Sequence, residues 1–435
     1  MKKHRIIGKR TVTYALLATM MLTISGCGEK KVKSDEPTSN SKNLTNGVEK
    51  EDVAGYELDE EFIYATADFS VELFKESVSA DVEEGKNVLI SPESVVCALS
   101  MTANGAGGDN LREMEKVITG GIDISEYNKY MYTYNNKLTQ SNDVDFHIAN
   151  SLWIKDDEEE IKVNNDFLKV CSNYYDAEAF MAPFDDTTVE EINTWVNENT
   201  NGMIPTLLDK IPDEVVMYLI NALAFEGEWE TPYKDTQVKE NQIFTNYSGE
   251  EQIVTMLHSK EDIYVCDDRA TGFIKYYKGG EFAFMALLPK DENELNEYVE
   301  NMSGETFINL YENRNYEDVI VRMPEFSYEY EKELSKPLMS MGMNTAFFDG
   351  ADFSNMATTG TGSLYINRVL HKTFIQVDRE GTKAAAVTAI EMSAETAMEE
   401  VEPPKEVILD RPFVYAIIDT QTGLPIFLGV LNSIE

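Results

Sequence analysis

The order of hydrophobic patterns along this chain predicts an α+β fold. Helical periodicity dominates the first part, and short apolar runs typical of buried strands dominate the second. Helices first and strands later indicate helices packed on a large mixed β-sheet rather than alternating β-α-β units. No second linker, repeat or low-complexity break divides residues 57–435, so we expect one large domain there.

Local patterns assign helices and strands in order along the chain. Helices are expected over residues 61–79, 93–103 and 188–199, and Ser91-Pro92 is a good start signal for the second. Strands are expected over residues 216–225, 282–288, 319–323, 373–377, 414–418 and 425–431. The last two strands are joined by Asp-Thr-Gln-Thr-Gly at 419–423, whose composition is typical of a hairpin turn.

The first 26 residues have the pattern of an export signal. Five basic residues precede an apolar run at 11–24, which is shorter than the roughly 20 residues of a membrane span. The sequence Ile-Ser-Gly-Cys ends this region and resembles the lipobox of bacterial lipoproteins, which implies a lipid on Cys27. The alternative is an ordinary signal peptide followed by an incidental cysteine.

Residues 27–56 are polar and contain few bulky apolar side chains. Such a composition is typical of a flexible tether. We therefore expect an extracytoplasmic protein, either a cell-surface lipoprotein or a secreted one. Its only membrane contact would be the lipid on Cys27.

Charge and cysteine content exclude several classes of protein. The net charge is −41, and because residues 1–26 hold five basic residues and no acid, the chain from Cys27 onward is at −46. This charge argues against nucleic acid as a partner and favours a soluble monomer. Cys97, Cys171 and Cys266 form no Cys-x-x-Cys pair, so neither a disulfide framework nor a metal site is expected.

The chain lacks the motifs of common enzymes. Beyond residue 26 only His147, His258 and His371 are present, with no Gly-x-Ser-x-Gly and no His-Glu-x-x-His sequence. The glycines at 105–108 follow a helical pattern rather than a strand, so they do not indicate a dinucleotide site. We expect no catalytic residues and no cofactor.

The stretch from Arg379 to Ala389 carries the strongest functional signal. One glycine is followed by a near-unbroken series of Thr, Ala and Val, and even-numbered positions from Thr382 to Met398 carry no charge. Period two with one uncharged face predicts a strand with one buried side. We interpret the stretch as exposed in the folded protein and able to become a strand later. The alternative is an ordinary Ala-rich helix or edge strand, because alanine is also the best helix former.

Several motifs in a fixed order resemble the serpin family of serine protease inhibitors, from about residue 61 to the C-terminus. These motifs are NVLISPES at 87–94, NTWVNENTNGMI at 193–204, LINALAFEGEW at 219–229, residues 370–382, RPF at 411–413 and GLPIFLG at 423–429. The resemblance implies the serpin fold, with helices packed on a large mixed sheet and an exposed reactive loop.

The resemblance also implies a mechanism. A serpin offers its loop to an endopeptidase, is cleaved to a covalent acyl complex, and inserts the loop as a new strand into its main sheet. Each new ladder hydrogen bond contributes roughly 1 kcal/mol, so about 15 inserted residues release on the order of 10 kcal/mol. At about 3.3 Å per residue, the loop end moves on the order of 50 Å.

The resemblance assigns roles to three groups of residues. These are a hinge (Gly381, Thr382, Ala384, Ala385 and Ala386), a shutter (Ser91, Ser94, Asn221 and His371) and a breach (Trp229, Glu325 and Arg379). Small, uncharged hinge residues suit insertion, because a charge buried between strands is costly. Non-inhibitory serpins typically have bulky, charged or proline residues in the hinge, so this one favours inhibition.

The breach departs from the family pattern. Serpins commonly place an acid two residues before the hinge glycine and pair it with a lysine. Here Arg379 stands at the acid position and Glu325 at the lysine position. We expect a swapped ion pair between them; two unrelated surface charges are the alternative.

The cleaved bond lies within a short window. The family's usual count from Gly381 places it between Glu395 and Thr396, but the loop is longer than usual, so Ala394, Ala397 and Met398 remain alternatives. Glu395 suits a glutamyl-specific protease, and the others suit an elastase- or subtilisin-like enzyme. No Lys or Arg occurs from 384 to 404, which disfavours trypsin-like targets. The other functional reading is a non-inhibitory serpin acting as a surface binding or structural lipoprotein.

Overall fold

The computed structural model describes residues 40–156, 161–213, 215–291, 294–360, 363–382 and 404–434. All of these belong to one compact unit. The predicted signal peptide, Cys27 and residues 383–403 lie outside the described residues.

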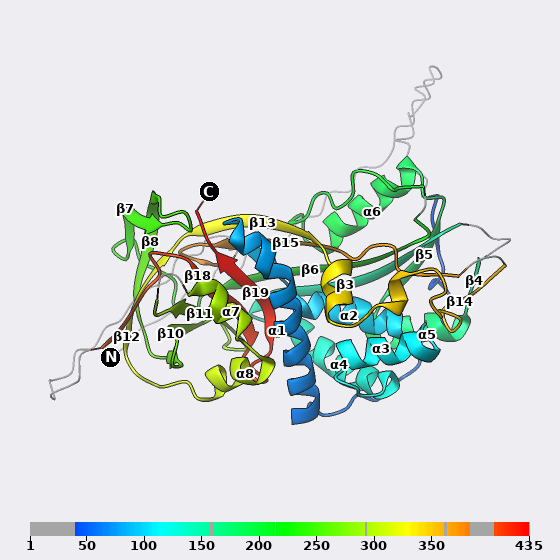
Figure 1. Ribbon diagram of the computed structural model, residues 1–435, viewed down its shortest axis with the longest axis horizontal. Helices are drawn as coiled ribbons and strands as arrows, with labels where there is room; N and C mark the ends of the chain where they lie inside the picture. The colour runs from blue at the N-terminus through cyan, green and yellow to red at the C-terminus, as the bar shows by residue number, and fades with distance from the viewer. Residues whose placement is uncertain are drawn as a thin grey trace, which may run out of the picture. The chain divides into compact units, whose positions relative to one another are not determined.

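Helices of very different length surround the sheets (Figure 1). In the described residues they are α1 (Glu60–Glu83), α2 (Pro92–Ala103), α3 (Gly108–Ile118), α4 (Ile124–Thr139), α5 (Asn165–Tyr175), α6 (Asp186–Asn199), α7 (Leu295–Glu300), α8 (Gly304–Glu312) and α9 (Ser335–Ser340), with a 3-10 turn at Thr345–Phe347. Every residue of α2 is buried, which makes it the central helix of the core.

The described strands form three main sheets and one small antiparallel pair. The seven-stranded sheet has the order β1 (Lys42–Asn43), β5 (Glu178–Ala182), β3 (Val144–Lys155), β6 (Met217–Glu228), β16 (Gly381–Thr382), β15 (Leu370–Val377) and β13 (Phe326–Glu333). The six-stranded sheet has the order β2 (Val88–Ile90), β19 (Pro425–Leu431), β18 (Phe413–Asp419), β11 (Phe282–Pro289), β10 (Ala270–Tyr276) and β9 (Tyr264–Cys266). The four-stranded sheet has the order β17 (Lys405–Ile408), β12 (Val319–Pro324), β8 (Glu251–Glu261) and β7 (Val238–Thr245), and β14 (Ala357–Thr359) pairs with β4 (Ile161–Val163).

Two hydrophobic layers cover the seven-stranded sheet. Along β6, alternate side chains face opposite ways, as the two-residue period of a strand requires. Leu219, Leu223 and Phe225 join the main core, whereas Ile220 and Ala224 join a smaller cluster under α6. Figure 1 accordingly shows α6 on one face of this sheet and α2 to α5 on the other.

Every helix and strand expected from local pattern is present. Ser91 caps α2 with its side chain, and Pro92 is the first helical residue, as the start signal predicts. β18 and β19 pair as an antiparallel hairpin around the expected turn. Elements such as α4 and β3 have weaker patterns and were not expected.

Residues 40–56, the N-terminal segment, differ from the prediction of a flexible tether. β1 pairs with β5 at the edge of the seven-stranded sheet, and Asn40 donates to Glu191 of α6 at 2.6 Å. Further along, Glu51 binds Lys169 of α5 at 2.8 Å. The edge strand of a sheet has unpaired N–H and C=O groups with which another segment can pair. This part of the expected tether therefore lies along the folded unit.

Within the described residues, none of the helices has both the length and the hydrophobicity needed to cross a bilayer. Cys97 and Cys171 are buried free thiols, and Cys266 is an exposed one.

Candidate functional site

The seam between β6 and β15 is the unusual feature of the seven-stranded sheet. β16 enters this seam, where Thr382 pairs with Gly227 of β6 and with Val377 of β15. Elsewhere in the described chain, direct pairing across the seam is limited to an isolated bridge between Leu219 and Val369. The two strands are thus joined at their ends, and a two-residue strand already sits at one end of the seam.

Gly381 and Thr382, the described part of the predicted hinge, are both buried. A Cβ on Gly381 would overlap with the carbonyl oxygen of Gly227, so this close approach of two backbones requires glycine. The Thr382 hydroxyl lies 2.5 Å from the phenol oxygen of Tyr277, with which it shares a hydrogen bond. The hinge therefore begins inside the sheet, with Thr382 facing the main core.

Trp229 fixes the turn that leads into the hinge. Its indole donates a hydrogen bond to the carbonyl of Asp378 at 2.9 Å, and its backbone N–H donates to Glu380 at 2.8 Å. The ring stacks on Tyr277, with centroids 4.6 Å apart. Trp229, the predicted breach tryptophan, therefore lies beside the turn that leads into Gly381 and Thr382.

The four predicted shutter residues lie together under the seam. The Ser94 hydroxyl donates to Asn221 of β6, and the Ser94 backbone N–H donates to the Ser91 side chain at 3.3 Å. The Asn221 amide donates in turn to Asn150 of β3 at 2.6 Å. Asn150 is thus a fifth member that sequence reasoning missed, because the strand containing it was not predicted.

His371 joins the shutter from the opposite side of the seam. The backbone N–H of Ser91 donates to its Nε2 at 3.0 Å, so this nitrogen acts as an acceptor and the ring is neutral. Burial lowers the pKa of His371 to about 4. A neutral histidine that accepts a hydrogen bond suits a seam that is held closed and remains able to part.

The predicted ion pair between Arg379 and Glu325 is wrong. The Arg379 guanidinium binds Asp235 in the turn after Trp229, a partner with an exposed side chain. Burial raises the pKa of Glu325, as does the nearby Asp378, while the backbone N–H and the charge of Arg379 oppose this shift. The Arg379 guanidinium pairs with Asp235 rather than with Glu325. An ion pair with the exposed Asp235 has a lower desolvation cost than one with the partly buried Glu325.

The rest of the predicted hinge and the reactive bond fall outside the described residues. These positions are Ala384, Ala385, Ala386, Ala394, Glu395, Thr396, Ala397 and Met398.

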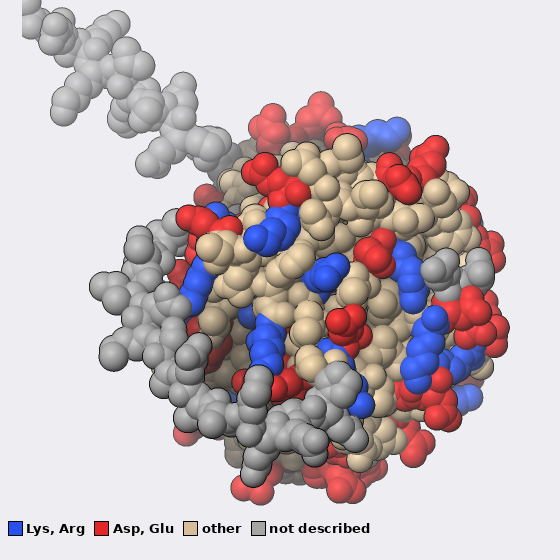
Figure 2. All heavy atoms as spheres, turned by 90° about the vertical axis from the view of Figure 1, so that its left-hand side faces the viewer, with Lys and Arg blue, Asp and Glu red and all other residues tan. Residues whose placement is uncertain are grey.

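Figure 2 shows the end of the molecule that carries β7, β8 and β12, where Lys and Arg side chains lie towards the middle and many carboxylates lie at the rim. Exposed basic residues on the four-stranded sheet are Lys239, Lys260, Arg322 and Lys405. β17 of this sheet begins at residue 405, just after the segment 383–403. The part of the chain that the structure describes contains no group of three or more His, Cys, Asp or Glu side chains able to hold a metal ion.

Comparisons with known proteins agree with this arrangement of sheets. A family model described as serpin (serine protease inhibitor) matches residues 64–434. The chain belongs to the serpin family. Members of this family are typically protease inhibitors without enzymatic activity of their own.

The most similar proteins found include prokaryotic serpins. An uncharacterized serpin-like protein of Thermococcus kodakarensis is 29% identical over 97% of this chain and 98% of its own length. Iripin-8 of the tick Ixodes ricinus is 28% identical over 80% of this chain and 88% of its own length.

Among solved structures, the thermophilic serpin Tengpin is 44% identical to this chain. Its native-state structure has a TM-score of 0.85 and covers 91% of this chain and 100% of that one. Its latent-state structure has a TM-score of 0.76, with 88% and 100% covered. The serpin fold is therefore established, and the described residues resemble the native state more than the latent one.

Proposed function

We propose that this serpin inhibits serine endopeptidases, with cysteine endopeptidases as a less favoured class, by inserting its cleaved loop between β6 and β15. The observation that carries this proposal is the position of β16. Gly381 and Thr382 already pair with β6, and Thr382 also pairs with β15. They lead the chain into a seam that is held by one bridge and a polar cluster. An inserting segment needs such an entrance.

The register of β16 supports the choice of inserting residues. If the antiparallel pairing continued, Ala384 would face Phe225 and Ala386 would face Leu223, which belong to the main core. Paired residues of neighbouring strands share a face, so the uncharged even-numbered positions would be the buried ones. Lys383 and Glu391 would point to the opposite face, on the side of α6.

Continued further, the same register would bring Thr388 between Asn221 of β6 and His371 of β15. A threonine hydroxyl both donates and accepts hydrogen bonds, so it would replace bonds that the shutter loses when the seam parts. This offers a physical reason for a polar residue among the alanines of the loop.

We infer a target with elastase- or subtilisin-like or glutamyl specificity, cleaving after Glu395 or at a neighbouring bond from Ala394 to Met398. The absence of Lys and Arg from residues 384 to 404 argues against trypsin-like enzymes. We also propose that a lipid on Cys27 holds the protein at the outer side of a membrane. This rests on the sequence Ile-Ser-Gly-Cys alone.

The test is to incubate residues 40–435 with elastase, subtilisin, a glutamyl endopeptidase and trypsin. We expect a covalent complex that survives boiling in detergent with at least one of the first three enzymes. Mass spectrometry of the released C-terminal peptide then identifies the cleaved bond. Cleavage by every enzyme without any complex would instead support a non-inhibitory serpin.

A further inference from the structure

Lys275 in β10 is a buried cation. Of the Lys and Arg residues that the structure describes, it is the one that is buried, with 4% of its surface exposed. Its ammonium donates to the carboxylate of Glu261 in β8 at 2.9 Å, and the Glu261 side chain is itself only 13% exposed. The pair therefore links the six-stranded sheet to the four-stranded sheet in a place from which water is largely excluded.

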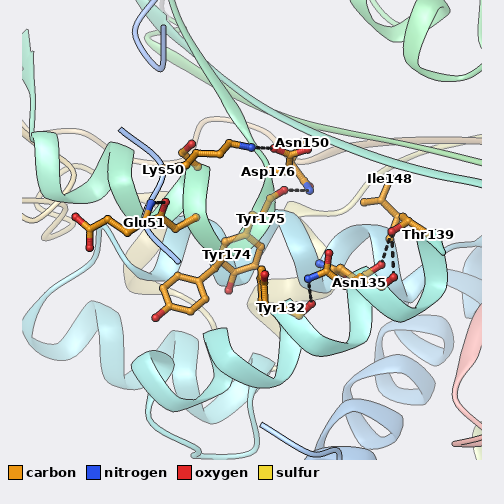
Figure 3. Close-up of a pocket in the computed structure, with 13 residues that line it drawn as sticks. Lys50, Glu51, Tyr132, Asn135, Thr139, Ile148, Asn150, Tyr174, Tyr175 and Asp176 are labelled. Carbon is orange, nitrogen blue, oxygen red and sulfur yellow. Dashed lines mark hydrogen bonds and ion pairs between the residues drawn. The ribbon is translucent and has the colours of Figure 1, made fainter. Parts of the chain in front are cut away.

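Ion pairs at the surface have a different energetic balance. Figure 3 shows one of them: Lys50 of the N-terminal segment lies beside Asp176 at an open cavity, and the two side chains are 63% and 86% exposed. Solvent screens such a pair, which contributes little to stability. Burying a pair costs the desolvation of both charges. The pair of Lys275 and Glu261 is therefore better explained by a role in fixing its neighbours than by a gain in stability.

Two aromatic rings lie close to the Lys275 ammonium. Its Nζ is 4.7 Å from the centroid of the Tyr233 ring and 5.6 Å from that of the Trp229 ring. Both distances are within the range of about 6 Å over which the negative face of a ring attracts a cation. This attraction is strongest where water is excluded, and both rings are buried. One charge therefore holds both rings in place.

The same two aromatic residues bind the turn between β15 and β16. This hinge turn consists of Asp378, Arg379 and Glu380, and each of its carbonyl oxygens accepts a hydrogen bond. The Trp229 indole donates to Asp378 at 2.9 Å, and the Trp229 backbone N–H donates to Glu380 at 2.8 Å. The Tyr233 backbone N–H donates to Arg379 at 2.9 Å. Whatever fixes these two aromatic residues also fixes the point at which β16 enters the seam.

We propose that Lys275 is a positioning residue for loop insertion. Its ammonium holds Trp229 and Tyr233, and these residues hold the hinge turn, which is the fixed end of the strand that inserts. A fixed end keeps the incoming strand in register with β6 and β15. A loose end slows the pairing and gives the protease time to hydrolyse the acyl bond and leave. The effect on insertion rests on the proposed inhibitory function, whereas the effect on the hinge turn does not.

Three variants separate the charge of Lys275 from its bulk. Lys275→Met removes the charge and keeps an unbranched side chain. Lys275→Arg keeps the charge, because a guanidinium stacks on aromatic rings and stays protonated, and a cavity of about 310 Å³ beside Lys275 leaves room for it. Lys332→Met is the matched control: Lys332 of β13 pairs at 2.6 Å with Asp81, whose side chain is 13% exposed, as that of Glu261 is.

The first measurement is hydrogen exchange of the backbone amides of Trp229 and Tyr233, which donate to the hinge turn. In Lys275→Met both should exchange about tenfold faster than in the wild type, because the loss of a cation beside their rings weakens the local structure. In Lys275→Arg and Lys332→Met they should exchange at the wild-type rate. Unchanged exchange in Lys275→Met would overturn the proposal. An equal increase in Lys275→Arg would also overturn it, because bulk rather than charge would then matter.

A double variant separates this local effect from a general loss of stability. Lys275→Met combined with Glu261→Gln removes both charges, and replacing a buried ion pair by neutral side chains is often neutral or stabilising. Urea unfolding should therefore give a free energy of unfolding close to that of the wild type, while the amides of Trp229 and Tyr233 still exchange faster. If this protein is stable and both amides exchange as slowly as in the wild type, Lys275 has no positioning role.

The second measurement is the fraction of cleaved molecules that trap the protease, with an enzyme that forms a covalent complex with the wild type. This fraction should fall several-fold in the double variant and should stay at the wild-type level in Lys275→Arg and Lys332→Met. An unchanged fraction despite faster exchange would overturn the role of Lys275 in insertion. If no protease forms a complex with the wild type, the proposed function fails and the role in insertion fails with it. The exchange data then decide whether Lys275 fixes the hinge turn.

Discussion

The six-stranded sheet and the seam of the seven-stranded sheet are closed in opposite ways. Every residue of β11, β18 and β19 is buried, and β11 pairs with β18 along its length from Phe282 to Leu287. In the seam, Leu219 of β6 and Val369, the residue before β15, form one isolated bridge, and the side chains that hydrogen-bond beneath the seam are polar. The six-stranded sheet is held by apolar burial, whereas the seam is held by a few exchangeable hydrogen bonds.

The difference separates stability from function within one chain. Parting the six-stranded sheet would expose apolar surface, at roughly 25 cal/mol for each Å². Parting the seam requires breaking hydrogen bonds that each contribute about 1 kcal/mol and that an incoming strand can replace. Mutations in the six-stranded sheet should therefore change the free energy of unfolding. Mutations in the seam should change whether the cleaved loop can insert.

The largest effect is expected from Thr382→Arg at the entrance of the seam. Thr382 is 3% exposed and faces the core beside Tyr277, so an arginine cannot be buried there without a counter-charge. Insertion should stop, and the target protease should cleave the variant as a substrate without forming a stable complex. Gel analysis of the reaction measures the fraction of complex.

Two controls accompany this variant. Thr358→Arg changes an exposed threonine of the short strand β14 and should leave complex formation unchanged. Thr382→Val keeps the shape without the hydroxyl and should retain most of the complex. If Thr382→Arg still trapped the protease, insertion at this seam would be ruled out.

Phe284→Ala in β11 should have the next largest effect, on stability. Phe284 is fully buried, stacks on Tyr415 at 5.6 Å between centroids and meets Trp229 edge to face at 6.0 Å. Truncation of a buried phenylalanine costs about 3–5 kcal/mol. Urea unfolding should show this loss, whereas the fraction of complex formed by folded protein should stay close to that of the wild type. A large loss of complex without a loss of stability would contradict the comparison.

The sequence predicted the seam well because its residues occur in short, distinctive segments. Ser91-Pro92 gave the start of α2, and the resemblance of 219–229 and 370–382 to family motifs gave the strands that flank the seam. These assignments needed only local pattern and chain order. The shutter residues Ser91, Ser94, Asn221 and His371 accordingly came together as expected.

The sequence did not predict contacts that depend on long-range geometry. Asn150 reaches Asn221 through the register of β3, and no local signal fixes that register. The predicted partner of Arg379 was wrong because the sequence pattern gives only positions along the chain. Whether Arg379 pairs with Asp235 or with Glu325 depends on how deeply each carboxylate is buried. The N-terminal segment was misjudged because polar composition does not reveal an open sheet edge.

The pH dependence of the seam should be smaller than the effect of Phe284→Ala. The pKa of His371 is about 4 in the folded protein and 6.5 when unperturbed, so between these values the unfolded chain binds more protons than the folded one. The contribution of His371 is therefore fully present above pH 6.5 and is lost as the pH falls towards 4, by about 2 kcal/mol at pH 5.

Urea unfolding of the wild type and of His371→Gln at pH 7.5 and pH 5 measures this contribution. Glutamine is neutral at both values, so the stability difference between the two proteins should shrink at pH 5. The comparison is needed because burial raises the pKa of Glu93 in α2 to about 8, and stability from that group falls as the pH rises above 4.5. An unchanged difference between wild type and His371→Gln would mean that His371 is not held neutral.

The smallest effect on stability is expected at the breach, where Arg379 pairs with the exposed Asp235. Asp235→Asn should change the free energy of unfolding by less than about 1 kcal/mol, because the Asp235 side chain is 93% exposed and solvent screens the pair. Glu325→Gln should be neutral or slightly stabilising, since it removes a partly buried charge close to Asp378. Urea unfolding at low and high salt distinguishes them: the effect of Asp235→Asn should vanish at high salt. A destabilisation by Glu325→Gln larger than that by Asp235→Asn would restore Glu325 as the main partner of Arg379.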